Sequence, residues 1–184
     1  MSNVTLCFVG PSSYPASKNL RNACANAVNN GVKHLTLLIS CPGGSTVEGF
    51  ALYYFLRALP VELTTYNIGS IESMGNMVFL AGDKRFASPH SRFMFHDLTW
   101  QFGNGEILDR DHIKERSQTL DSDAQRFVSI LKLRSKVTDA DLDALKMFKQ
   151  SAIVPASRAK EVGIVDDVTD AKIPSGQPVY NIDY

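Results

Sequence analysis

The stretch Gly69-Ser70-Ile71-Glu72-Ser73-Met74-Gly75 places a serine between two glycines, where a strand pattern gives way to an apolar helix. A serine at a strand-to-helix turn holds its hydroxyl clear of the sheet, near the free N–H groups of the helix start. That geometry suits a nucleophile, although a lone serine in a glycine-rich turn is more often a helix cap. The choice depends on two partners elsewhere, the turn Pro42-Gly43-Gly44-Ser45 and the histidine of Phe93-Met94-Phe95-His96.

The composition indicates one α/β domain with no charge bias. A chain of 184 residues is long enough to bury roughly 70% of its unfolded surface, so we expect a single domain over residues 1–184. Nineteen basic and nineteen acidic side chains give a formal net charge of zero, and no Lys/Arg run stands out. Because a phosphate backbone or an anionic membrane attracts clustered positive charge, we expect neither nucleic acid nor a membrane as a partner.

The three cysteines, Cys7, Cys24 and Cys41, stand in no metal-ligand spacing, and each lies in an apolar or helical pattern. They predict buried thiols in a reducing, cytoplasmic setting, with no metal and no cofactor. Cys41 is an alternative nucleophile, but it ends a hydrophobic strand, which favours core packing. The start Met1-Ser2-Asn3-Val4 does not resemble a cleavable signal, and no apolar run approaches membrane-spanning length.

Strand and helix patterns alternate along the chain. Apolar runs bounded by turn residues predict strands at 4–9, 34–40, 62–68, 84–87 and 92–96, and a last strand that begins with Ile164-Val165. Apolar stripes at helical spacing predict helices at about 15–30, 45–59, 73–82, 106–136, 139–148 and 157–162. This order indicates right-handed strand-helix-strand units that form a mostly parallel sheet. The helix opened by Ser73 is apolar nearly all round, which predicts burial at the centre of the domain.

The long helix predicted at about 106–136 differs between its two halves. Its first half is highly charged, whereas the second carries an apolar stripe that includes Leu120, Phe127 and Leu131. We expect the second half to pack on the core and the first to project beyond it as a subunit contact, with a solvated helix end as the alternative. The turn-rich tail, about 170–184, is expected to be poorly ordered unless it docks on a neighbour.

Acyl transfer at a serine needs a base for the hydroxyl proton and donors for the developing oxyanion. His96 ends an apolar strand, where a titratable side chain is normally avoided, and a histidine is a suitable base at neutral pH. Gly43 and Gly44 have no β-carbons to block a substrate backbone. The N–H of Gly44, together with that of Met74, can form an oxyanion hole for an attack by Ser73.

Four segments, in order and at closely similar spacing, resemble the proteolytic subunit of the ATP-dependent Clp protease. They are Ser40-Cys41-Pro42-Gly43-Gly44-Ser45, Gly69-Ser70-Ile71-Glu72-Ser73-Met74-Gly75, Ser91-Arg92-Phe93-Met94-Phe95-His96 and Ala159-Lys160-Glu161-Val162-Gly163-Ile164-Val165-Asp166. The resemblance covers about Val4 to Val168. It implies a ClpP/crotonase-like spiral of strand-helix-strand units with a protruding handle helix, about 98–136. It also implies that Ser73 is the nucleophile, His96 the base, and the N–H groups of Gly44 and Met74 the oxyanion donors.

Family membership would make the chain a serine-type endopeptidase that hydrolyses peptides or unfolded proteins through an acyl-enzyme. The resemblance further implies a chamber of stacked homo-oligomeric rings, with an ATP-dependent unfoldase as a possible partner. The family's third catalytic residue is an aspartate, and counting back from Gly163 places Ser151 at its position. Two alternatives therefore stay open. One is a weakly active or inactive ring subunit that assembles with a paralogue, and the other is a crotonase-type acyl-CoA enzyme.

Aspartates at other positions are candidates for the missing orienting role. We expect one of them to orient His96 only if the local chain path differs from that of the family. The four candidates are Asp97, Asp139, Asp141 and Asp143.

Overall fold

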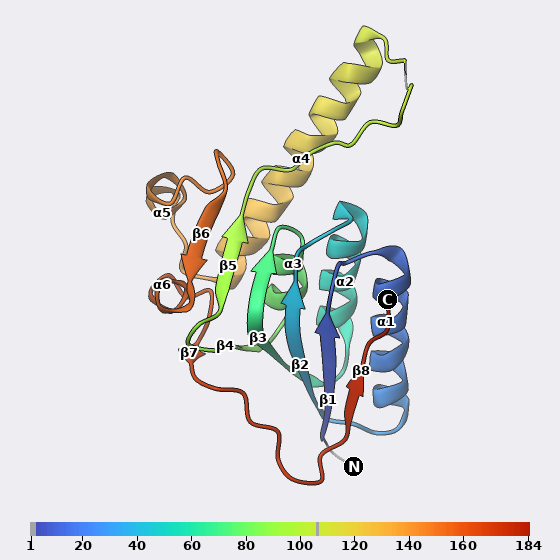
Figure 1. Ribbon diagram of the computed structural model, residues 1–184, viewed down its shortest axis with the longest axis vertical. Helices are drawn as coiled ribbons and strands as arrows, with labels where there is room; N and C mark the ends of the chain where they lie inside the picture. Colours follow the sequence, from blue (N-terminus) through green and yellow to red (C-terminus); the bar gives the residue numbers. More distant parts are fainter. Residues whose placement is uncertain (1–2, 106) are drawn as a thin grey trace.

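The computed structural model describes residues 3–105 and 107–184, which form an eight-stranded sheet with helices packed against it (Figure 1). The strands are β1 (Asn3–Val9), β2 (His34–Cys41), β3 (Glu62–Glu72), β4 (Lys84–Ala87), β5 (Arg92–Phe95), β6 (Ala152–Pro155), β7 (Asp167–Val168) and β8 (Val179–Asn181). The helices are α1 (Tyr14–Asn29), α2 (Thr46–Ala58), α3 (Gly75–Leu80), α4 (Arg110–Arg134), α5 (Asp139–Ala144) and α6 (Ala156–Glu161).

The sheet is mostly parallel, as the alternating pattern predicted. Its main order is β6-β5-β3-β2-β1-β8, and β5–β6 is the antiparallel pair. Strand β3 is long and pairs with two different strands on the same side: Thr64–Asn67 lie beside β4, whereas Ser70–Glu72 lie beside β5. The sheet therefore divides along β3, and the end of β3 that leads to Ser73 follows the β5 branch.

Three helices, α1, α2 and α3, cover one face of this sheet (Figure 1). Alternate residues of β1 and β2, such as Leu6, Phe8, Leu37 and Ile39, are at most 1% exposed. Leu20 of α1 is equally buried. The period-2 pattern of the strands thus meets the apolar stripes of the helices, which creates a continuous core behind the sheet.

Helix α3 lies in the middle of this core. All six of its residues are buried, which confirms the prediction from its apolar sequence. The helix begins at Gly75, however, and not at Ser73. The reason is local, because the φ of Ser73 is +49°, outside the right-handed helical region. Strand β3 correspondingly runs to Glu72, four residues beyond the predicted end.

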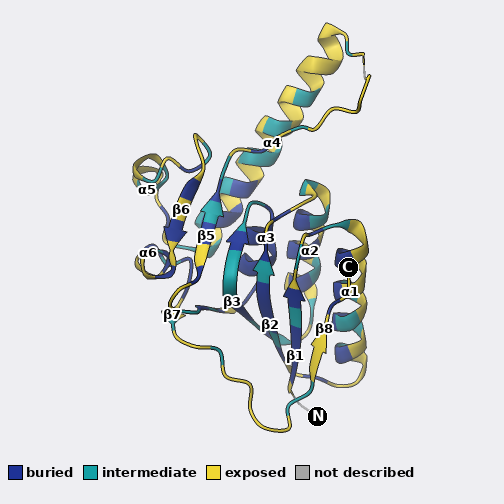
Figure 2. Ribbon diagram, viewed as in Figure 1, coloured by how far each residue is buried: buried dark blue, intermediate teal, exposed yellow. Residues whose placement is uncertain are grey.

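Helix α4 projects from the body of the molecule (Figure 2). It begins at Arg110, because the Asp109 side chain caps it by accepting a hydrogen bond from the His112 N–H at 2.9 Å. The predicted start, Glu106, lies outside the described residues. The buried residues of α4 belong to its second half, as expected; they are Phe127, Ile130 and Leu131. No helix of the described ranges has the length and apolar character needed to cross a membrane.

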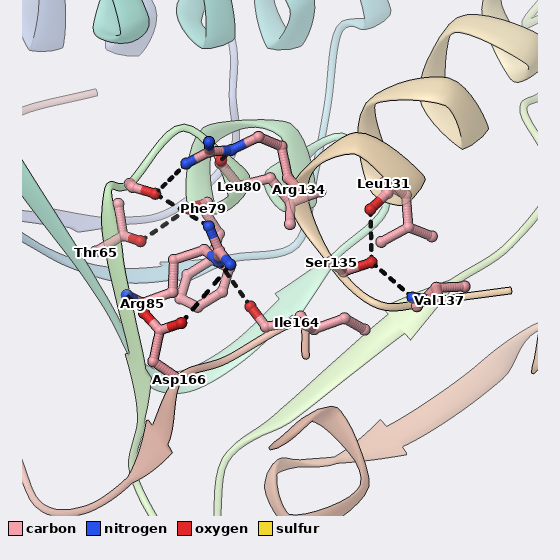
Figure 3. Close-up of polar contacts among 11 residues, drawn as sticks. Thr65, Phe79, Leu80, Arg85, Leu131, Arg134, Ser135, Val137, Ile164 and Asp166 are labelled. Atoms are coloured by element: carbon pink, nitrogen blue, oxygen red, sulfur yellow. Dashed lines mark hydrogen bonds and ion pairs between the residues drawn. The ribbon is translucent and has the colours of Figure 1, made fainter. Parts of the chain in front are cut away.

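Two arginines fix the base of α4 to the core (Figure 3). Arg134, the last residue of α4, donates to the carbonyls of Leu80 at 3.0 Å and Gly82 at 2.7 Å. Arg85 of β4 is 7% exposed and donates to the Ile164 carbonyl at 2.9 Å and to Gly82 at 3.2 Å. The two guanidinium groups share the Gly82 carbonyl, so the projecting helix starts from a rigid, hydrogen-bonded platform.

The last third of the chain departs most from prediction. Strand β6 was not predicted, and α5 is shorter than the predicted helix at 139–148. The strand predicted to begin with Ile164-Val165 is present as β7 but starts later, at Asp167, because Ile164 and Val165 lie in a bend before it. The N–H groups of Ile164 and Val165 both donate to the Ala159 carbonyl, at 2.8 and 3.3 Å, so these two residues satisfy a carbonyl at the C-terminal end of α6.

The tail, expected to be poorly ordered unless it docks on a neighbour, docks instead on its own chain. Residues 179–181 form β8, which pairs in parallel with β1 of the same chain. The Thr5 N–H donates to the Pro178 carbonyl, and the Ile182 N–H donates to the Cys7 carbonyl, both at 2.9 Å. An exposed sheet edge offers unpaired N–H and C=O groups, and β8 satisfies part of that edge on β1.

Candidate active site

Ser73 stands in a strained turn between β3 and α3. Its φ of +49° is uncommon for a residue other than glycine, and such residues concentrate at functional sites. Its N–H donates to the Met94 carbonyl of β5 at 3.0 Å, and its side chain is half-buried. The turn is thus attached to the neighbouring strand two residues before His96.

Asn76 holds the same turn from the side of α3. Its Nδ2 donates to the Ser73 carbonyl at 2.9 Å and to the Met94 carbonyl at 3.0 Å, and the residue is 1% exposed. This role could not be predicted from the sequence, because the bond to Met94 joins two segments that only the fold brings together. Asn76 therefore stabilises a backbone conformation that Ser73 would otherwise avoid.

The turn Pro42-Gly43-Gly44-Ser45, called the glycine turn from here on, lies directly against Ser73. A β-carbon on Gly43 would come within 2.7 Å of Ser73 Cβ and 3.2 Å of the Met74 nitrogen. Gly43 also has a φ of +94°, so both space and backbone conformation require glycine. In residues 3–105 and 107–184, neither the Gly44 N–H nor the Met74 N–H donates to a protein acceptor. Unpaired donors beside a hydroxyl suit an oxyanion hole.

A segment after β1 clamps the glycine turn. The Ser12 N–H donates to the Gly43 carbonyl at 2.7 Å, and the Ser45 N–H donates to the Ser12 carbonyl at 3.2 Å. These two bonds flank Gly44 on both sides. Ser12 was not a predicted site residue, because its contact is made through the backbone, which no side-chain motif reveals.

His96 directly follows β5 and is half-buried. Its Nδ1 lies 2.6 Å from the carbonyl oxygen of Asp97. Because a carbonyl can only accept, Nδ1 must carry the proton, which leaves Nε2 of the neutral ring free to accept one. Across the described ranges no hydrogen bond joins the Ser73 hydroxyl to His96. Catalytic hydrogen bonds often tighten only when substrate is bound.

The antiparallel register of β5 and β6 ends just before His96. The last pair in that register is Phe95 with Ala152. Extending the register by one residue past both strands pairs His96 with Ser151, the position counted from the sequence. We infer from this extension that the residue opposite His96 carries a hydroxyl in place of a carboxylate.

The other candidate carboxylates are bonded elsewhere. Asp139 accepts from Lys132 at 2.5 Å, Asp141 from Arg158 at 3.0 Å and Asp143 from Lys149 at 2.5 Å. The Asp97 carboxylate accepts from the Leu98 N–H at 2.9 Å, so Asp97 contacts His96 through its backbone carbonyl alone. The orienting hydrogen bond of His96 is therefore neutral.

Two further polar groups near Ser73 take no part in this arrangement. The Glu72 carboxylate accepts from the Ser70 hydroxyl at 2.6 Å and lies 3.4 Å from Nη2 of Arg92. Cys41 is fully buried, and burial raises the pKa of its thiol. A buried thiol that resists ionisation is a poor nucleophile, so Ser73 remains the better candidate.

Residues 16–172 match the model of a protein family described as Clp protease. The chain belongs to the Clp protease family. The ATP-dependent Clp protease proteolytic subunit of Bdellovibrio bacteriovorus is 29% identical over 151 residues, which cover 79% of this chain and 68% of that protein. The proteolytic subunit 2 of Corynebacterium diphtheriae is 30% identical over 141 residues, covering 76% and 68%.

A solved structure of a ClpP1 variant from Listeria monocytogenes matches the fold. It superposes with a TM-score of 0.77 at 16% sequence identity and covers 91% of this chain and 92% of its own. The predicted ClpP-like α/β fold is thereby confirmed. The family membership identifies the chain as a Clp protease homologue, and its residue roles follow as proposals.

Proposed function

We propose that this Clp protease homologue is a serine-type peptidase with Ser73 as nucleophile and His96 as general base. The observation that carries the proposal is the Ser73 turn. A half-buried serine at positive φ lies against Gly43 of the glycine turn, and the residues that follow each of them, Met74 and Gly44, have N–H groups with no acceptor in the described ranges. This combination provides both a reactive hydroxyl and the donors that an acyl-transfer transition state needs.

The proposed reaction proceeds in two steps. The Ser73 oxygen attacks the carbonyl carbon of the peptide bond while Nε2 of His96 takes the hydroxyl proton. The carbonyl oxygen becomes an oxyanion, held by the N–H groups of Gly44 and Met74. His96 then gives its proton to the departing amine as the C–N bond breaks, which leaves an ester on Ser73. Water, activated by the same nitrogen, hydrolyses the ester and restores the serine.

The Asp97 carbonyl supports the role of His96. Its oxygen lies 2.6 Å from Nδ1 and accepts a hydrogen bond from the Nδ1–H group, so the ring presents an unprotonated Nε2, as a base requires. A backbone carbonyl carries no formal charge and stabilises the imidazolium less than a carboxylate does. We therefore expect slow turnover compared with relatives that have the aspartate.

Active-site labelling tests this proposal. A fluorophosphonate is expected to form a covalent adduct with the wild type at Ser73, and Ser73→Ala should not react. Ser70→Ala is the matched control, because Ser70 is a neighbouring serine whose hydroxyl donates to Glu72. A folded wild type that takes no label, or a label that persists in Ser73→Ala, would exclude Ser73 as the nucleophile.

A second function is favoured by Ser151. Ser151, which pairs with His96 when the β5–β6 register is extended by one residue, lacks a carboxylate, as would suit a weakly active or inactive ring subunit that assembles with an active paralogue. Peptide hydrolysis by the purified protein alone separates the two functions. Efficient cleavage excludes the second, whereas cleavage only after mixing with an active relative excludes the first. The family match favours either function over an acyl-CoA enzyme of the crotonase type.

Assembly into rings around a chamber completes the proposal, with peptides or unfolded proteins as substrates and a cytoplasmic site of action. The N-terminal half of α4 and the segment before it expose large apolar side chains, with Ile107 at 96% and Ile113 at 55%. Arg116 lies over the ring of Trp100, 4.3 Å from its centroid. Exposed apolar groups on a projecting helix indicate a contact surface for another subunit. An unfoldase is a further proposed partner.

A further inference from the structure

We propose that residues 177–184, called the docked segment, hold the glycine turn in position, with Tyr184 as a positioning residue that acts through Gly10 and Ser12. The coupling itself is a statement about structure. Its effect on catalysis rests on the proposed peptidase function.

Tyr184 lies directly on the backbone of Gly10. A β-carbon on Gly10 would come within 2.3 Å of the Tyr184 ring carbon Cζ. Gly10 has a φ of +145°, and its N–H donates to the Ser40 carbonyl at 2.9 Å. The Tyr184 ring also packs near Phe8, with centroids 6.0 Å apart. The ring therefore covers the point where the chain leaves β1.

Ser12, two residues after Gly10, is hydrogen-bonded to the glycine turn. Ser12 binds the carbonyl of Gly43 and the N–H of Ser45. The fit at Gly44 is close, since a β-carbon there would lie 2.8 Å from the Ser12 carbonyl oxygen. A movement of residues 10–12 must therefore move Gly43 and Gly44, and with them the proposed oxyanion donor.

The docked segment is held by few contacts. Three register pairs join β8 to β1, and Gln177 donates to the Thr5 hydroxyl at 2.7 Å. Asn19 of α1 donates to the Asp183 carbonyl at 3.1 Å. The buried apolar side chain of the docked segment is that of Ile182, at 6% exposure.

A partly open pocket of about 540 Å³ lies between the docked segment, β1 and α1. Its lining includes Val4, Leu6, Ala27, Val32 and Ile182. A segment that borders such a space makes fewer packing contacts than a well-packed strand. The docked segment is thus an element that a single substitution can release.

The ring, and not the hydroxyl, is the important part of Tyr184. Burial, with the nearby Cys41 and Cys7 thiols, raises the pKa of Tyr184 to about 12. The side chain stays neutral at any ordinary assay pH, so phenylalanine should replace it and alanine should not.

Amide hydrogen exchange tests the coupling without reference to activity. The Ser45 N–H is protected by its bond to Ser12. In Tyr184→Ala, its exchange is expected to quicken about tenfold, because opening of the clamp becomes easier. Tyr184→Phe should exchange like the wild type. Tyr54→Ala, which removes a similarly exposed tyrosine from α2, is the control and should leave Ser45 unchanged.

Unchanged exchange at Ser45 in Tyr184→Ala overturns the proposal. If Tyr184→Ala fails to fold, Gly10→Ala replaces it, because the added β-carbon displaces the same ring. Wild-type exchange at Ser45 in Gly10→Ala would likewise overturn the proposal.

Kinetics then test the catalytic effect. We expect kcat of Tyr184→Ala to fall about tenfold with KM unchanged. Complete removal of an oxyanion donor lowers kcat by about 10²–10³-fold, and a displaced donor should cause a part of that loss. Tyr184→Phe should restore kcat. A wild type that takes no fluorophosphonate while Ser45 responds to Tyr184→Ala refutes the peptidase function and leaves the coupling intact. Unaltered kcat with a responsive Ser45 refutes the positioning role.

Discussion

Replacing Ser151 by aspartate tests the proposed catalytic arrangement most directly. Extending the β5–β6 register one residue past Phe95 and Ala152 pairs residue 151 with His96, and opposed residues of antiparallel strands have Cα atoms about 4.5–5.5 Å apart. An aspartate side chain can span that gap to Nδ1. Ser151 is exposed, so the substitution should change stability by no more than about 0.5 kcal/mol.

The expected gain follows from the hydrogen bond that aspartate would replace. Nδ1 of His96 now donates to a neutral carbonyl at 2.6 Å. A neutral hydrogen bond contributes about 0.5–1.5 kcal/mol and one to a charged group about 1.5–3 kcal/mol, so the exchange is worth about 1.4 kcal/mol. If this is expressed in the transition state, where the ring becomes positive, kcat rises about tenfold.

The assay is hydrolysis of a fluorogenic peptide, supported by the rate of fluorophosphonate labelling. Ser151→Asn is the matched control, since it has the same shape as aspartate without the charge, and should give no gain. A Ser151→Asp variant that folds but turns over no faster than wild type would show that residue 151 does not reach His96. An equal gain in Ser151→Asn would show that charge is not the cause.

Three further outcomes are expected. Gly43→Ala should lower kcat at least tenfold, because its β-carbon meets Ser73. Gly31→Ala is the control, since Gly31 has a φ of +77° but no atom within 4 Å of the added β-carbon. It shares only the backbone strain of roughly 1 kcal/mol and should stay active. Urea unfolding across pH tests Asp83: burial opposes its ionisation, but hydrogen bonds from the Leu63 N–H and Arg57 lower its pKa below 3.8. The stabilisation that ionised Asp83 contributes is therefore complete above pH 3.8 and lost as the pH falls. The free energies of unfolding of the wild type and Asp83→Asn should converge in acid, and a difference that stays constant with pH would contradict this. Finally, Ile113→Asp should shift the proposed oligomer toward smaller species in analytical ultracentrifugation, while Val47→Asp, at an apolar and even more exposed position on α2, should not.

The fold was predictable where long periodic segments determine it. The strands and helices up to Ala87 were predicted in the right order, because each pairs a clear apolar pattern with a glycine or proline stop. Strand β6 was missed because its four residues end in Pro155, which usually argues against a strand. Strand β8 is equally short, and its position depends on an edge of β1 that no local pattern reveals.

The side chains proposed for the site stand in motifs that the sequence reveals, whereas the residues that support them do not. Ser73, His96 and the glycines stand in recognisable motifs, and the structure brings Ser73 against the glycine turn. Asn76 and Ser12 act through contacts that are distant in sequence. The neutral partner of His96 is a backbone carbonyl, which every residue has, so the sequence cannot distinguish it.

The division of β3 lies just before the candidate site. Between its two pairings, Asn67 donates to the Arg92 carbonyl at 2.8 Å and accepts from the Gly69 N–H at 3.0 Å, which fastens the β5 branch to β3. Beyond this point β3 still pairs with the end of β2 that leads to the glycine turn, Ile71 with Cys41. Ser73, His96 and the glycine turn therefore follow three adjacent strand ends that are hydrogen-bonded to one another, so a displacement of one strand end is transmitted to the other two.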